Sequence, residues 1–95
     1  MVVGVMKLGL FLPENHSLKG KRGVLRRIEA RVSHRFHISV TECDDQDLWQ
    51  SAVLGFGVVG SNSRIVDATL RKIIAFVDEL KLAQVGKSEI EIFHV

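Results

Sequence analysis

The chain has 95 residues, of which 46% are hydrophobic and 25% are charged, with one proline and one cysteine. This length and composition predict one globular domain, residues 1–95, whose core needs neither a disulfide nor a structural metal. Lys7 interrupts the first apolar stretch, so we expect no signal peptide. No later apolar stretch approaches the roughly 20 residues that a membrane-spanning helix requires. We therefore expect a cytoplasmic protein that is not embedded in a membrane.

The formal net charge of +2 conceals an uneven distribution along the chain. The segment from Ser17 to His37 holds seven basic side chains and one acid, Glu29, and so carries a formal charge of +6. The basic residues are Lys19, Lys21, Arg22, Arg26, Arg27, Arg31 and Arg35. The rest of the chain carries −4, and its acids gather at Glu42, Asp44, Asp45 and Asp47. We expect a basic pole and an acidic loop.

The first half of the chain predicts a strand, a helix and a second strand. Residues 2–12 are mostly apolar, and the alternation of a strand gives them one set of side chains that faces the core. That set is Met6, Leu8, Leu10 and Leu12. Ser17 is suited to cap a helix in which apolar residues recur at helical spacing up to Phe36. Residues 37–43 alternate as in a half-buried strand, and residues 44–47 predict a polar turn.

The second half of the chain predicts a strand, a helix and a closing strand. Residues 50–59 form the partner of the preceding strand in a hairpin with a longer loop. The polar cluster at residues 60–63 starts a second helix, whose apolar positions continue at helical spacing to Leu80. Gly86 is expected to end this helix, and residues 87–95 alternate as a final strand.

The resulting order, βαββαβ, predicts a ferredoxin-like α+β fold in which two helices cover one face of a four-stranded antiparallel sheet. The other face of the sheet then stays uncovered. Its expected side chains are mixed in polarity: Val5, Lys7, Phe11, Ser39, Thr41, Glu89, Glu91 and Phe93. Such a face can contact water, a second subunit or a nucleic acid.

Two segments resemble a known bacterial family. The segment His16-Ser17-Leu18-Lys19-Gly20-Lys21-Arg22 resembles the Ser-Leu-Lys-x-Lys-Arg signature of the YlxP-like family of unknown function. Val59-Gly60-Ser61-Asn62-Ser63 is similar to the small and polar stretch that opens the second helix of that family, with Gly60 inserted. The resemblance covers essentially the whole chain in element order. It implies a ferredoxin-like protein of the bacterial cytoplasm in an RNA-related setting, because genes of the family commonly lie among those for translation and ribosome maturation. It supplies no catalytic residues.

The basic residues of the first helix, Lys21 included, are the candidate nucleic-acid-binding site. At about 100° per residue, they flank both sides of the apolar face. One side holds Lys19, Arg22 and Arg26, and the other holds Arg27, Arg31 and Arg35. Arginine forks and several cations together bind a phosphate backbone with salt-dependent affinity. The alternative is a solvated helix face whose long side chains cover the edge of the core. We expect a non-enzymatic RNA- or ribosome-associated module.

The alternative function is self-association without nucleic-acid binding. An uncovered ferredoxin-like sheet exposes apolar area that a two-fold homodimer would bury. The candidate interface residues are Val5, Phe11 and Phe93. Self-association is also compatible with the first hypothesis.

The segment Leu54–Val59 partly matches the third-strand signature with which RNA-recognition motifs stack bases. Leu54 replaces the expected cation, and Val58 replaces the second stacking aromatic residue. Alternation also groups Phe56 with the bulkier apolar set of this strand. We therefore expect Phe56 in the core.

No motif predicts a catalytic or metal site. The acidic turn lacks the pattern of a calcium loop, so a solvated turn is preferred to a cation site. His34 and His37 lie near Cys43 in the sequence, but there is no second cysteine at zinc-ligand spacing. Cys43 would need an orienting histidine to act as a nucleophile, and we expect an ordinary thiol at a strand end. We expect no metal, no cofactor and no enzymatic activity.

Overall fold

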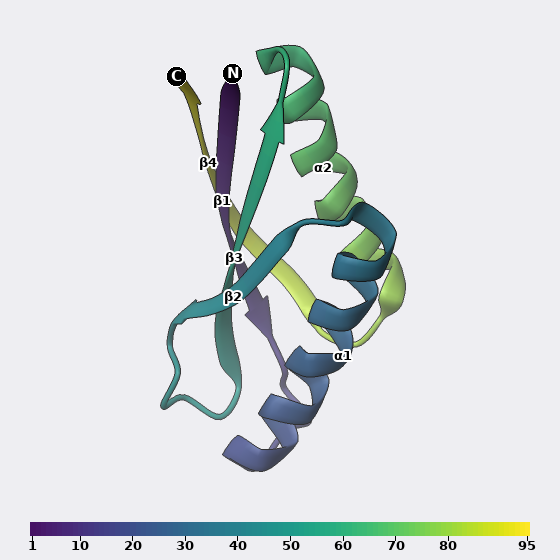
Figure 1. The fold of residues 1–95 in the computed structure, drawn as a ribbon. Coiled ribbons are helices and arrows are strands. Elements are labelled where there is room, and N and C mark those ends of the chain that lie inside the picture. The colour runs from purple at the N-terminus through teal and green to yellow at the C-terminus, as the bar shows by residue number, and fades with distance from the viewer.

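The computed structural model describes residues 1–95, which form six elements in the predicted order. The elements are β1 (Val2–Phe11), α1 (Leu18–Phe36), β2 (Ser39–Asp44), β3 (Ser51–Gly60), α2 (Ser63–Leu80) and β4 (Gln84–His94). The strands form one antiparallel sheet in the order β2-β3-β1-β4. Both helices lie on one side of this sheet, and the two chain ends lie together at one end of it (Figure 1). The predicted ferredoxin-like α+β fold is confirmed.

The core lies between the sheet and the helices, and the two central strands supply half of its buried apolar side chains. Side chains of β1 and β3 alternate between buried and more exposed along almost their whole length, as a sheet with one covered face requires. The predicted inward set of β1 is buried, and Phe56 of β3 is only 3% exposed. The helices add Leu25, Ile28 and Val32 from α1 and Val66, Leu70, Ile73 and Val77 from α2. The alternation predicted for both strands is confirmed.

Polar side chains fix where the helices begin. The Ser17 hydroxyl accepts a hydrogen bond from the backbone N–H of Gly20, and Asn62 caps α2 in the same way. Each helix ends at a residue with left-handed backbone geometry, His37 after α1 and Lys81 after α2. Neither helix is long and apolar enough to cross a membrane.

The start of the last strand differs from the sequence-based prediction. α2 ends at Leu80 and β4 begins at Gln84, so Gly86, predicted to end the helix, lies inside a strand. Gly86 is beside Gly9, where the register of β4 on β1 shifts. A Cβ on Gly86 would sit 3.4 Å from the carbonyl oxygen of Gly9. That distance is an ordinary contact, so Gly86 lies at a β-bulge without being sterically required there, and it does not end the helix.

The connection between β2 and β3 is also longer than the predicted turn. Asp44 is the last residue of β2 and Ser51 the first of β3, so residues 45–50 form the loop. Asp45 has left-handed backbone geometry with φ of 61°, which aspartate adopts more readily than most residues. In Figure 1 this loop and the start of α1 lie at the end of the molecule opposite the chain termini.

Candidate nucleic-acid interface and the open sheet face

Six basic side chains are exposed along α1, and none of them has an acidic partner. They are Lys19, Arg22, Arg26, Arg27, Arg31 and Arg35. The four ion pairs of the protein involve other residues. These six side chains, here called the basic row, flank both sides of the apolar face and extend about 24 Å along the helix axis at a rise of 1.5 Å per residue. α1 therefore presents uncompensated positive charge over nearly its whole length.

Lys21, the seventh basic residue predicted for this site, is not accessible. Only 1% of the residue is exposed, and its ammonium group lies against the loop between β2 and β3. Nζ donates to the carbonyl oxygens of Asp45, Gln46 and Ser51 at 2.8, 3.2 and 3.2 Å. These three bonds use its three protons, and the Glu42 carboxylate 3.1 Å away is a charge partner without a hydrogen bond. Lys21 is therefore removed from the candidate nucleic-acid-binding set, because its charge and donors are used inside the fold.

Further contacts fix the same loop to the beginning of α1. The Asn15 side-chain amide donates to the carbonyl oxygens of Ser17 and Trp49. The Gln50 amide donates to two carbonyl oxygens of the segment before α1, at 3.0 and 3.1 Å. A Cβ at Gly20 would overlap the Asn15 side-chain oxygen, so a larger residue there would require the Asn15 side chain to shift. The segment before α1, the first turn of α1 and loop 45–50 thus form one interlocked unit.

The far end of the basic row is tied to the second helix. The guanidinium carbon of Arg35 lies 5.5 Å from the ring centroid of Phe76 and 5.9 Å from that of Phe36. The two rings meet edge to face, with their centroids 5.5 Å apart. Cation–π attraction orients Arg35 over this contact while leaving the side chain exposed.

Glu29 is the only acid of α1, and it forms no ion pair with an arginine of its own helix. Burial raises the pKa of its carboxyl, the negative charge of Glu42 raises it further, and Arg26 lowers it. No ion pair links Glu29 to the basic row. The one acid of the helix therefore leaves that row without a paired counter-charge.

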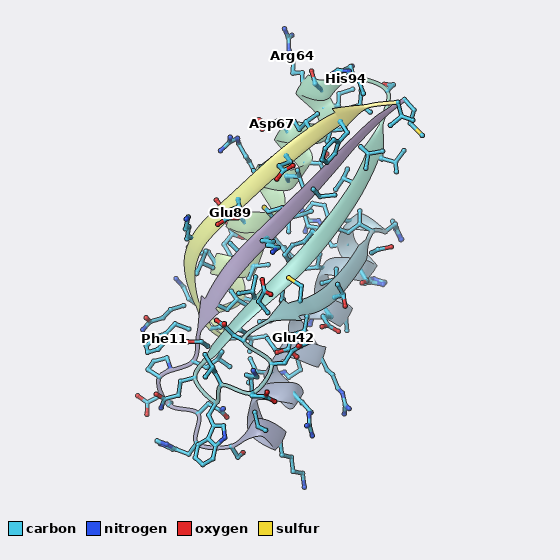
Figure 2. The ribbon with its side chains drawn as sticks, turned by 90° about the vertical axis from the view of Figure 1, so that its left-hand side faces the viewer. Phe11, Glu42, Arg64, Asp67, Glu89 and His94 are labelled. Atoms are coloured by element: carbon cyan, nitrogen blue, oxygen red, sulfur yellow. The ribbon has the colours of Figure 1, made fainter.

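Figure 2 views the uncovered face of the sheet directly. Exposure and strand register place apolar side chains at both ends of this face. Near the chain termini, Val3 lies between its register partners Val59 on β3 and Phe93 on β4. At the other end, Phe11 is labelled at the tip of β1 in Figure 2. The predicted interface residues Val5, Phe11 and Phe93 are 40%, 43% and 47% exposed. Their predicted position on an uncovered face is confirmed.

The centre of this face is ionic. Lys7 Nζ on β1 lies 3.1 Å from Asp44 Oδ2 on β2, although β3 separates the two strands. The register partner of Lys7 on β3 is Gly55, which has no side chain to block this path. The hydrogen bond to Asp44, and then its charge, raise the pKa of Lys7. On the other side Glu89 lies directly opposite Lys7, so acidic groups flank this lysine on both sides.

A shallow cavity of about 460 Å³ lies on the same face over Gly55 and Gly57, and it includes the only cysteine. Burial, followed by the charge of Asp44, raises the pKa of the Cys43 thiol, against a smaller opposing effect of Lys7. A thiol with a raised pKa is a poor nucleophile near neutral pH. No group of three or more histidine, cysteine, aspartate or glutamate side chains converges as a set of metal ligands.

Trp49 is an exposed aromatic residue that the sequence patterns did not single out. It lies in loop 45–50 and is 55% exposed, beside Leu48 at 51%. A tryptophan after an acidic run, outside any periodic segment, gives no signal in the sequence. Its position next to α1 depends on the contact of its carbonyl oxygen with Asn15, which also binds Ser17.

Comparison with known proteins identifies the family. The family described as "Protein of unknown function (DUF503)" matches residues 3–90. The chain belongs to the DUF503 family. The "Uncharacterized protein YlxP" of Bacillus subtilis (strain 168) is 34% identical over 77 residues, which are 81% of this chain and 84% of that relative. The resemblance to YlxP-like proteins is confirmed.

Solved structures share the fold of this DUF503 chain at low identity. The de novo designed protein Foldit4 aligns with a TM-score of 0.52 and 10% identity, over 99% of this chain and 97% of that one. Protein YJCS aligns with a TM-score of 0.52 and 11% identity, over 94% and 96%. A VAO-type flavoprotein from Myceliophthora thermophila aligns with a TM-score of 0.53 and 14% identity. The alignment covers 97% of this chain but only 16% of that protein. These likenesses show the fold alone.

The segment that carries the DUF503 resemblance divides into a structural and an exposed part. Ser17 caps the helix, and Gly20 leaves room for the Asn15 side chain. Lys21 binds loop 45–50. Lys19 and Arg22 of the same segment are exposed. The motif therefore has a structural explanation that does not depend on a ligand, and only its two exposed cations add to the basic row.

Proposed function

We propose that this DUF503 chain is an RNA-binding module that contacts phosphates through α1. The observation that carries the proposal is the row of six exposed basic side chains without an acidic partner. Like charges on one helix repel each other, and a polyanion laid along the row relieves that repulsion and releases counterions. Arginines supply five of the six cations, and their planar forks match phosphate oxygens. The RNA-related setting implied by the family makes ribosomal or translation-associated RNA the expected partner.

The proposal is that the chain acts by binding and not by catalysis. The groups with altered proton affinity on the open face support it. Lys7 is held by Asp44, and the raised pKa of Cys43 keeps its thiol protonated near neutral pH. Neither group is prepared for nucleophilic attack.

A salt titration with a structured RNA tests the phosphate row. Each phosphate neutralised contributes about 0.9 to the slope of log affinity against log salt on a duplex, so engagement of the whole row gives a slope of about 5. Replacing Arg26→Ala together with Arg31→Ala should weaken binding and lower the slope by about 2. Both residues are exposed, so the fold should be retained.

The matched control removes two positive charges from the other helix. Arg64 and Lys72 are exposed on α2 and belong to no ion pair. Arg64→Ala with Lys72→Ala changes the net charge by the same amount, but should leave the slope close to that of the wild type. Equal slopes for the two double variants, or no RNA binding at low salt, would show that α1 is not the binding surface.

A second candidate function is homodimerisation through the open sheet face. The observation that favours it is apolar exposure at both ends of a face whose centre carries Lys7 opposite Glu89. Such a face is complementary to a second copy of itself, because the lysine of one subunit can meet the glutamate of the other across a two-fold axis.

Phe11→Ser with Phe93→Ser should shift the sedimentation mass from dimer to monomer. Ile65→Ser, at an exposed position of α2, is the control, and a monomeric wild type at micromolar concentration would exclude this function.

A further inference from the structure

Loop 45–50 holds the exposed indole of Trp49 on a restrained backbone. The carbonyl oxygens of Asp45 and Gln46 accept from Lys21, and that of Trp49 accepts from Asn15. The next residue, Gln50, accepts from the backbone N–H of Leu12 and donates two bonds of its own. Loops are usually mobile because they make few contacts of this kind. This one is anchored on both sides of Trp49, so the ring is presented from a fixed base.

Loop 45–50, which carries the exposed indole of Trp49, lies at the same end of the molecule as the start of the basic row. Asn15 joins Trp49 to Ser17 through a single side-chain amide. Ser17 is the cap of α1, and the exposed Lys19 and Arg22 belong to the first turns of that helix. Figure 1 shows loop 45–50 and the start of α1 together at the end remote from the chain termini.

We propose that Trp49 stacks on an unpaired base of an RNA whose phosphates lie along α1, and this inference rests on the proposed function above. Unpaired bases in loops and bulges are the parts of RNA that proteins recognise by stacking on aromatic side chains. An aromatic platform beside a positively charged track is the combination that binds single-stranded nucleic acid. The protein therefore selects RNAs in which a single-stranded base adjoins a phosphate run.

The acids of the loop fit this assignment. Asp45 and Asp47 are exposed on the same loop as Trp49. Carboxylates at this point repel a phosphate backbone, but they do not oppose a neutral base, so the backbone is directed toward α1 and the base toward the indole. A protein partner is less suited, because Leu48 and Trp49 are the only exposed large apolar side chains of the loop. Two side chains supply far less area than a specific protein interface buries.

The fluorescence of the protein reports directly on this contact. Trp49 is the only tryptophan, and the chain contains no tyrosine, so emission comes from the proposed site alone. The probes are a stem-loop RNA with unpaired adenosines and the same stem as a blunt duplex. Stacking on a base quenches an indole, so the stem-loop should quench Trp49 emission and the duplex should leave it nearly unchanged.

Variants separate stacking from charge. Trp49→Leu should lower affinity for a dye-labelled stem-loop about tenfold, leave affinity for the duplex unchanged and retain the salt slope. Trp49→Phe should restore most of the preference for the stem-loop, because it keeps an aromatic face. Ile65→Ala, at an exposed apolar position of α2, is the control and should change neither affinity.

The outcomes distinguish this inference from the proposed function. If RNA binds with the predicted dependence on Arg26 and Arg31, but Trp49 emission is constant and Trp49→Leu weakens both RNAs equally, base stacking is overturned and the phosphate row stands. Absence of RNA binding overturns both. A change in Trp49 emission with protein concentration alone, without RNA, would place the loop in a contact between copies of the chain and would also overturn base stacking.

Discussion

At the scale of single residues, Lys21 illustrates how a basic side chain in a basic segment can serve the fold. Removing an ammonium group from water carries a large desolvation penalty unless every donor finds a partner. Here three backbone carbonyl oxygens and the charge of Glu42 provide that compensation. Those carbonyl oxygens belong to loop 45–50 and to the start of β3. Lys21 therefore supplies the donors that a tighter turn would supply from its own backbone N–H groups.

The first prediction concerns this lysine. Lys21→Met should lower the free energy of unfolding in urea by about 3 kcal/mol, because it leaves three carbonyl oxygens and the half-buried Glu42 carboxylate without their partner. Lys19→Met, at an exposed position two residues earlier, should change it by less than about 0.5 kcal/mol. Equal losses for the two variants would contradict the anchoring role of Lys21.

The second prediction concerns Glu29. Its pKa is raised above the ordinary value of 4.5, mainly by burial, so the folded protein binds this proton more tightly than the unfolded chain. The ionised carboxylate therefore destabilises the fold at pH 7, and the penalty disappears below pH 4.5, where both states are protonated. Glu29→Gln should raise the free energy of unfolding at pH 7, with a difference from wild type that shrinks on acidification. A difference independent of pH would contradict this origin.

At the scale of elements, α1 and loop 45–50 are held together, and the helix carries exposed positive charge while the loop carries exposed negative charge. Lys21 holds the loop against the helix, which brings exposed carboxylates close to the start of the basic row. The carboxylates are not equivalent. Asp44 is engaged with Lys7 on the open sheet face, whereas Asp45 and Asp47 belong to no ion pair. For an RNA bound along α1 as proposed above, these two acids would repel the backbone from the loop.

A third prediction tests that repulsion. Asp45→Asn with Asp47→Asn should raise RNA affinity severalfold at low salt, with an effect that falls as the Debye length shortens toward about 8 Å at physiological ionic strength. Asparagine tolerates the left-handed backbone at position 45, so the loop should retain its shape. The sedimentation mass should not change. Dissociation of an oligomer at constant RNA affinity would assign the loop to a subunit interface instead.

At the scale of the whole molecule, the two candidate surfaces lie on opposite sides of one sheet. The basic row belongs to a helix that packs on the covered side, and the apolar ends belong to the uncovered side (Figures 1 and 2). The four-stranded sheet and the hydrophobic core packed on it separate the two surfaces. Because no charged side chain of α1 contributes to the open face, occupancy of one surface should not alter the chemistry of the other.

The last prediction follows from this separation. Arg26→Ala with Arg31→Ala should weaken RNA binding and lower the salt slope while leaving the sedimentation mass of the free protein unchanged. Phe11→Ser with Phe93→Ser should change the mass of any dimer while leaving the affinity of each subunit for a short stem-loop within about twofold. Loss of RNA binding in the second variant would mean that the open face itself contacts RNA.

The sequence by itself determined the element order, the inward set of β1 and the burial of Phe56, because alternation and helical spacing follow directly from local geometry. It also indicated the uncovered face and the basic segment. Only the tertiary structure separated Lys21 from the other cations, because its three acceptors lie 24 to 30 residues away. Gly86 lies at a β-bulge that forms only where β4 meets β1, and the backbone of Trp49 is held by Asn15. Contacts between residues far apart in the chain leave no periodic pattern, so only the folded chain reveals them.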